Sequence, residues 1–296
     1  MKLSLFSVSY AGYWGQHDLD VPGFVAKAAE LGYDSVMIAG KRPHLSPLDA
    51  SPDYLASIKT ALDEQGIACD VVGGYTDLSP AAAAEVPYLE MQIAYVESLA
   101  SMAAKLGASV VRVFTAYEVE GHSPHAIWTG VVKTLQEMCD RAAVHGVTIA
   151  VQNHHDIGVH TDWLLEILND IDRPNCKLGF DAWSPALRGE DLYEAARKMA
   201  PHTAITTNAD YVRLSRFRYQ PALVNYCKEE PDLVRAVKFG EGFIDYEAFF
   251  RGLTEGGFDG IANYEMCSPV RGGGAIENLD SYAAHYIKWM QEKVLG

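Results

Sequence analysis

The sequence has few cysteines, few basic residues and no long apolar segment. Its five cysteines are odd in number, widely spaced and without a Cys-x-x-Cys pair. This distribution favours reduced thiols in the core over disulfides or a cysteine redox or metal site. No apolar run approaches the ~18 residues of a membrane helix, and the N-terminal residues look like a strand and not a signal peptide. We therefore expect a cytoplasmic protein with no membrane partner.

Basic residues are strongly outnumbered by acidic ones. The chain has 24 Lys and Arg against 39 Asp and Glu, a net charge of −15. That charge opposes binding to nucleic-acid backbones, so we expect no nucleic-acid partner. The length of 296 residues suits one α/β barrel. We predict a single domain over residues 1–296.

Strand-like and helix-like segments alternate along the chain. Three of the expected helices stop at Gly32, Gly66 and Gly107, each followed by a strand; glycine there supplies the left-handed residue that ends a helix. Such alternation predicts right-handed βαβ units and a parallel sheet, and eight units fit the length. We predict a (β/α)8 TIM barrel. The expected strands are residues 3–9, 34–39, 67–72, 109–114, 147–152, 176–180, 203–207 and 260–264.

Residues 210–239 break this rhythm, and we interpret them as a long loop after the seventh strand. Long insertions at this end of a barrel are more often functional than idle. Arg213, Arg216 and Arg218 lie in it, and Arg271 follows the eighth strand. Barrels often place anion-binding groups in these loops, so we predict that these arginines bind an anionic or heavily hydroxylated substrate. Oligomer contacts or internal salt bridges are the alternative.

Polar residues end three of the expected strands: Gln152 the fifth, Asp181 the sixth and Glu265 the eighth. A parallel barrel brings such ends together at one mouth. Oxygen ligands of this kind suit Mg²⁺ or Mn²⁺. The alternative is that the carboxylates are structural, hydrogen-bonded groups in a metal-free barrel.

Two histidines follow the fifth strand. Alternation places His154 on the same side as Gln152, and His155 on the other side. Adjacent histidines at the carboxyl end of a strand suit proton transfer, so both are catalytic candidates. His154 is also a candidate for contact with a metal or substrate.

The run Gly240-Glu241-Gly242-Phe243-Ile244-Asp245-Tyr246 resembles a motif of the xylose-isomerase-like barrels. This group includes sugar isomerases, ketose 3-epimerases, inosose-processing enzymes and AP endonucleases. The Gly256–Gly260 run with Glu265, the Phe180-Asp181 pair and the Gln152-Asn153-His154 run match as well. The similarity covers the whole chain, and we interpret the stretch 238–246 as a loop that closes over a site.

The resemblance implies a divalent metal ion held by Glu, Asp, His and Glu from the fifth to the eighth strands. Asp181 and Glu265 match this set, but Gln152 stands at the first Glu and Thr207 at the His. Asn208 takes the latter place if the register slips by one residue. The chain thus resembles a member with an altered metal-ligand set, with Mn²⁺ or Mg²⁺ as the expected ion. The family also implies a homo-dimer or homo-tetramer.

The resemblance further implies an isomerase or epimerase that acts on a keto sugar or related polyol (an inosose or sugar acid) through an enediolate. Glu265 is the expected base, and the non-titrating Gln152 excludes a pair of glutamates. Trp14 could stack on the sugar's apolar face, and His122 lies in a loop at the predicted mouth. The alternatives are a lyase, which eliminates from a 3-keto-glycoside or dehydrates an inosose, and a non-catalytic sugar-binding barrel. An AP endonuclease fits poorly, because it needs a histidine-rich zinc cluster.

Overall fold

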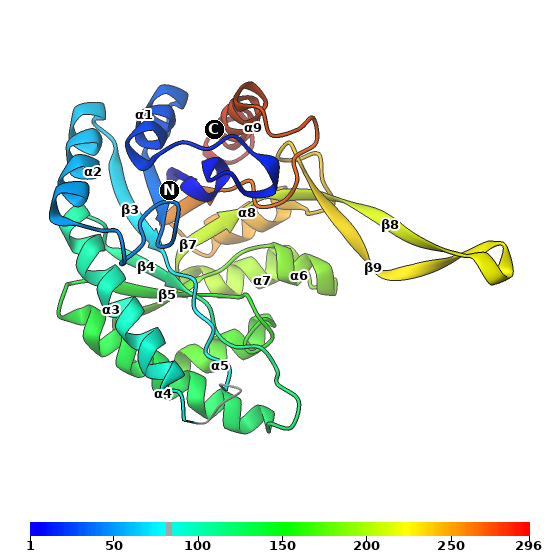
Figure 1. Ribbon diagram of the computed structural model, residues 1–296, viewed down its shortest axis with the longest axis horizontal. Coiled ribbons are helices and arrows are strands. Elements are labelled where there is room, and N and C mark those ends of the chain that lie inside the picture. The colour runs from blue at the N-terminus through cyan, green and yellow to red at the C-terminus, as the bar shows by residue number, and fades with distance from the viewer. Residues whose placement is uncertain (81–84) are drawn as a thin grey trace.

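Eight parallel strands close into a barrel in the computed structural model, which describes residues 1–80 and 85–296 (Figure 1). Neighbouring strands follow the chain order, and the last one pairs with the first. The predicted TIM barrel is therefore confirmed. The barrel strands are β1 (Lys2–Phe6), β2 (Ser35–Ala39), β3 (Ala68–Gly73), β4 (Val110–Val113), β5 (Thr148–Gln152), β6 (Cys176–Gly179), β7 (Thr203–Asn208) and β10 (Ile261–Tyr264).

Helices surround the barrel and connect its strands (Figure 1). The predicted glycine stops are confirmed: Gly32, Gly66 and Gly107 each follow a helix with φ of 88°, 63° and 85°. Two short helices between β6 and β7 were not predicted from the sequence. The helices are α1 (Val21–Leu31), α2 (Pro52–Gln65), α3 (Tyr88–Leu106), α4 (Pro124–Ala143), α5 (Thr161–Ile171), α6 (Trp183–Arg188), α7 (Leu192–Met199), α8 (Tyr246–Glu255) and α9 (Ile276–Met290). No helix in the described ranges is long and apolar enough to cross a membrane.

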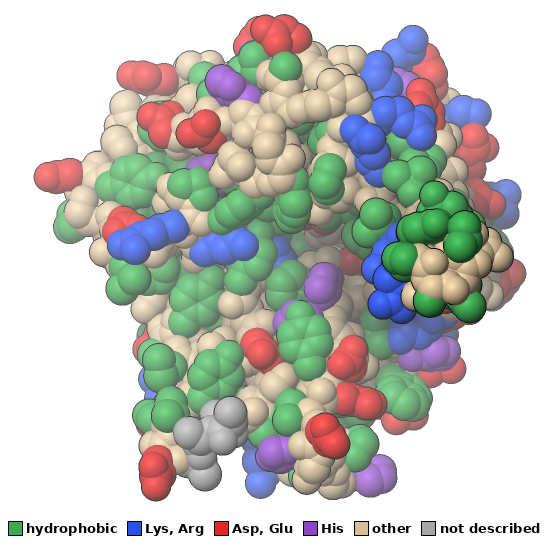
Figure 2. Space-filling model, turned by 45° about the vertical axis from the view of Figure 1, so that its right-hand side comes forward, with side chains coloured by type: hydrophobic (Ala, Val, Ile, Leu, Met, Phe, Trp, Pro, Cys, Tyr) green, Lys and Arg blue, Asp and Glu red, His purple; other side chains and the backbone are tan. Residues whose placement is uncertain are grey.

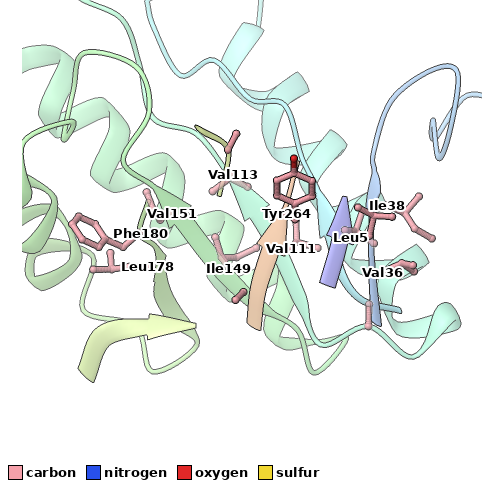
Figure 3. Packing of buried hydrophobic residues seen from close by; sticks show 14 of the residues in the cluster. Leu5, Val36, Ile38, Val111, Val113, Ile149, Val151, Leu178, Phe180 and Tyr264 are labelled. Atoms are coloured by element: carbon pink, nitrogen blue, oxygen red, sulfur yellow. The ribbon is translucent and has the colours of Figure 1, made fainter. Parts of the chain in front are cut away.

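The main core lies between the strands and the helices. Every second residue of a strand points outward, so Val36 and Ile38 of β2, or Val111 and Val113 of β4, pack under the helices (Figure 3). These side chains are fully buried, and each such burial stabilises the fold by roughly 1.5–3 kcal/mol. The intervening residues point into the barrel and form a second, smaller apolar cluster, which includes Phe6, Met37, Val71, Val110, Ala150 and Ile205.

Residues 210–237 form an antiparallel hairpin and not the predicted long loop. Strands β8 (Asp210–Gln220) and β9 (Asn225–Val237) pair from end to end and project from the barrel as an arm (Figure 1). The arm carries exposed hydrophobic side chains, which gather at its tip (Figure 2). Apolar residues and arginines alternate with a period of two in β8, which is the pattern typical of a strand. It changes phase near Ser215, where the pairing register shifts.

The glycine-rich stretch 238–246 fastens the base of this arm. The Oδ2 atom of Asp210 accepts hydrogen bonds from the backbone N–H groups of Gly240 and Gly242, at 2.9 and 2.7 Å. Phe243 N donates to Tyr211 O at 2.9 Å. None of the residues in this stretch lines the cavity at the barrel mouth. The interpretation of this motif as a loop closing over a site is therefore wrong; it is a structural clasp.

Gly242→Ala should open this clasp. A Cβ atom at Gly242 would lie 1.9 Å from Asp210 Oδ1 and 2.6 Å from Tyr211 O. Because both neighbours are fixed, we expect a loss of about 2–3 kcal/mol in the free energy of unfolding, with faster proteolysis of the arm. Gly130→Ala in α4 is the control, since nothing lies within 4 Å of its Cβ position and alanine favours helix. Equal stability of the two variants would contradict the clasp.

Candidate active site

The barrel interior changes from apolar to polar toward the carboxyl ends of its strands. Val110, Ala150 and Ile205 belong to the inner apolar cluster. Two residues later on the same strands, and so on the same side, come Arg112, Gln152 and Thr207. All three are buried. The apolar cluster thus forms the floor beneath a polar mouth.

A cavity of about 470 Å³ opens at this mouth, a size that suits a small-molecule ligand. Its wall is largely aromatic, with charged groups set between the rings. Asp181 and Thr207 are buried and do not line it. The residues that line it are Phe6, Val8, Trp14, Lys41, Tyr75, Thr76, Asp77, Tyr88, Gln92, Arg112, Phe114, Tyr117, Gln152, His154, His155, Trp183, Glu265 and Cys267.

Asp181 is held in a hydrogen-bonded setting directly after β6. Gln152 Nε2 donates to its Oδ2 atom at 2.6 Å, and Trp183 N donates to Oδ1 at 3.2 Å. The Asn153 side chain fixes the backbone of Asp181 through both its N–H and its C=O. Burial, reinforced by the charge of Glu265 and opposed by the bond from Gln152, raises the pKa of Asp181 to about 7.

Glu265 is the acidic residue at the end of β10, and it lines the cavity. Cys267 Sγ donates to its Oε1 atom at 3.1 Å, and Tyr211 Oη lies 2.7 Å from that sulfur. Burial raises the pKa of Glu265, although the Cys267 bond and the charge of Arg112 both oppose the shift. Because the charge of Glu265 in turn raises the pKa of Asp181, the two carboxyls interact electrostatically.

Two neutral oxygens at the mouth have no hydrogen-bond partner among the described residues: Gln152 Oε1 and Thr207 Oγ1, both buried. With Asp181 and Glu265 they make a set of four oxygen-bearing side chains. The described residues include no group of three or more His, Cys, Asp or Glu suited to a metal. An all-oxygen set with two carboxylates still fits Mg²⁺ or Mn²⁺, which keep water or substrate as further ligands.

Both histidines line the cavity, so the prediction that His155 points to the other side of the strand is wrong. Strand β5 ends at Gln152, and His155 has a φ of +68°, so alternation does not reach it. His155 N donates to His154 Nδ1 at 2.9 Å, which leaves Nε2 to carry the proton of a neutral His154 ring. Desolvation, with the charges of His155 and Arg112, lowers the pKa of His154 to about 4. At neutral pH, His154 is therefore a hydrogen-bond donor and not a protonated acid.

Several predicted site residues lie away from the cavity. Asn208 points outward, because it sits on the opposite side of β7 from Thr207. Its Nδ2 atom donates to Asn263 O and to Tyr286 Oη.

The predicted arginines Arg213, Arg216 and Arg218 belong to the arm. Arg213 stacks on Phe243, Arg216 donates to Pro231 O and Arg218 pairs with Glu229. Arg271 and His122 are exposed and, like these arginines, do not line the cavity. Trp14 does line it, as predicted.

Lys41, Tyr75 and Arg112 line the cavity but were not predicted from the sequence. Arg112 lies within a strand of valines, where a lone charge is usually assumed to face solvent. Its position two residues after Val110, on the inner side, was the signal that could have found it.

A comparison with protein families identifies residues 25–293 with the xylose isomerase-like TIM barrel family. The chain belongs to this family. No curated protein sequence matches it significantly. Several solved structures share the fold at low sequence identity, and each of these matches covers nearly the whole of both chains.

One is D-allulose 3-epimerase from Methylomonas sp., at 16% identity and a TM-score of 0.75 over 99% of this chain and 97% of that one. Another is D-psicose 3-epimerase from Clostridium cellulolyticum H10, at 15% identity and a TM-score of 0.76 over 99% of both chains. A third is a probable 3-DHS dehydratase of petrobactin synthesis from Bacillus anthracis, at 16% identity and a TM-score of 0.73 over 98% of this chain and 99% of that one.

The raised pKa of Asp181 makes stability fall with rising pH near neutrality. The folded state holds a proton at pH 6 that the unfolded chain, with an ordinary carboxyl pKa, has already lost. From pH 6 to pH 8 this group should lower the free energy of unfolding by about 1.4 kcal/mol.

Denaturant titrations at both pH values, with a chelator present, measure the effect. Asp181→Asn should lose this part of the pH dependence, whereas Asp259→Asn, at an exposed position, should keep it. Identical pH dependence in wild type and Asp181→Asn would show that the pKa is not raised.

Proposed function

We propose that this protein is an enzyme that removes a proton next to the carbonyl of a keto sugar or related polyol, and so acts as an isomerase or epimerase. The observation that carries the proposal is a pair of interacting carboxyls at the mouth of this barrel, the buried Asp181 and the half-buried Glu265. Family membership and the epimerase folds of the solved relatives support it.

Glu265 is the base in this proposal. Within the set formed by Asp181, Glu265, Gln152 and Thr207, it alone both titrates and lines the cavity. Its raised pKa brings the carboxylate closer to the basicity that proton abstraction at neutral pH needs. The neutral His154 ring, with its proton on Nε2, donates a hydrogen bond to the oxygen that becomes negative in the enediolate.

We also propose that a divalent cation takes part, held by Asp181 and Glu265 with the unpartnered oxygens of Gln152 and Thr207. Such an ion polarises the substrate carbonyl when bound. The protein's own contribution is to hold Asp181 rigidly, through Gln152, Asn153 and Trp183, and to surround the reacting atoms with aromatic walls that exclude water.

A lyase is the second candidate, and Gln152 is the observation that favours it. Inversion at carbon needs a base on one face and a proton donor on the other, and Gln152 cannot titrate. An enediolate next to a leaving group expels that group when it is not reprotonated. The dehydratase among the structural relatives is consistent with this outcome.

Solvent deuterium exchange tests the proposed reaction. In D₂O with Mg²⁺, we expect a panel of keto sugars and inososes to include a compound that loses its C–H signal in the proton NMR spectrum. Glu265→Gln should slow this exchange by about 10²–10⁴-fold, because it removes the base. His122→Gln, outside the cavity, is the control. New vinylic signals indicate the lyase, and no exchange with any compound would overturn the proposal.

Metal binding is tested separately by calorimetric titration with Mn²⁺. We expect one site per chain that is weakened at least tenfold in Asp181→Asn, since that variant loses one of two charged ligands. Asp259→Asn should bind as the wild type does. Exchange activity that persists in excess chelator, together with no Mn²⁺ binding, would remove the metal from the proposal.

A further inference from the structure

Arg112 is a buried cation that forms no salt bridge with any described residue. Its side chain is 2% exposed and is the largest among the fully buried ones. Neither Nε nor Nη1 has a hydrogen-bond partner within the described residues. An unpaired charge in this position is costly to the fold, which points to a function that requires it.

Aromatic rings surround the guanidinium of Arg112, and the residue lines the cavity. The guanidinium carbon lies 4.1 Å from the ring centroid of Phe114, 5.0 Å from that of Tyr75 and 5.5 Å from that of Phe6. Gly73 makes room for it, because a Cβ atom there would lie 3.2 Å from Arg112 Nη2. Rings contact the faces of a guanidinium, whereas carboxylates bind its N–H edge.

Lys41 brings a second positive charge to the same cavity. Its Nζ atom lies 3.7 Å above the ring of Tyr75, which also contacts Arg112. Burial and the charge of Arg112 lower the pKa of Lys41. Neither cation pairs with a carboxylate in the part of the chain that is described. Two cations that converge in a chain of net charge −15 make a local field that attracts an anion.

The two cations and the two carboxyls of the proposed reaction come from opposite sides of the barrel. Lys41 follows β2 and Arg112 lies on β4, whereas Asp181 follows β6 and Glu265 follows β10. In the closed order β1-β10-β7-β6-β5-β4-β3-β2, these are the two halves of one mouth. Asp77, which follows β3, also lines the cavity on the side of the cations. A ligand that spans the cavity therefore meets Lys41 and Arg112, with this one carboxylate, on one side and Glu265 on the other.

We infer that Arg112 and Lys41 form a subsite for a carboxylate of the substrate, so that the substrate is an acidic polyhydroxy carbonyl compound and not a neutral sugar. This rests on the proposed function for the reacting end, but the binding of the acid group is independent of it. The arginines of the arm do not line this cavity.

Binding of matched compounds tests the subsite without requiring turnover. We expect D-fructuronate to bind at least tenfold more tightly than D-fructose in calorimetric titrations, and to raise the melting temperature where fructose does not. Arg112→Met should abolish this preference, and Arg112→Lys should restore part of it. Arg218→Met in the arm is the control and should keep the full preference.

Arg112→Met should itself fold and melt at a higher temperature than the wild type, because it replaces an unpaired buried charge with an apolar side chain. Equal binding of acid and neutral sugar, or a preference that survives Arg112→Met, would overturn the inference. So would stabilisation by fructose 6-phosphate but not by the acid. If the acid binds through Arg112 but no compound exchanges deuterium, the subsite stands and the proposed reaction fails.

Discussion

Closure of the barrel imposes the constraint on which the rest of this structure depends. Alternate residues of the eight strands point into the narrow interior of the barrel and form layers. Side chains at the mouth therefore pack on the layer below them. Here the lower layer is an apolar cluster. The buried side chains of Arg112, Gln152 and Thr207 therefore lie directly above apolar residues. Their polar atoms can form hydrogen bonds only with one another, with groups at the strand ends or with a ligand.

This constraint explains why the polar groups at the mouth are perturbed together. Burial raises the pKa values of Asp181 and Glu265 and lowers those of His154 and Lys41. Each shift disfavours the charged form, as desolvation does. Perturbed groups that share one cavity are typical of functional sites. The unpartnered atoms of Arg112, Gln152 and Thr207 belong to the same region.

Much of the architecture could be predicted from the sequence, because alternation and glycine stops depend on local physics. Asp181 and Glu265 could be predicted to converge because parallel strands end at one rim. Arg112 could not be found so easily, since a single charge in a valine-rich strand gives no local sign of facing inward. The orientation of His155 depended on where β5 ends, which alternation alone does not fix.

The arm illustrates the other limit. A stretch with no core to pack against has the sequence character of a loop, although a two-stranded ladder satisfies its backbone. The Gly240–Gly242 motif carried a correct family resemblance but a wrong structural interpretation, because its partner, Asp210, is thirty residues away in the chain. Such a pairing follows from the tertiary fold and not from local sequence.

The position of that clasp has a mechanical consequence. Eleven residues of extended strand give the arm a reach of roughly 35 Å, and its ladder begins at Asp210, three residues beyond Thr207. Only Ala209 separates the end of β7 from β8, so a shift of the base of the arm is passed directly to the strand that carries Thr207.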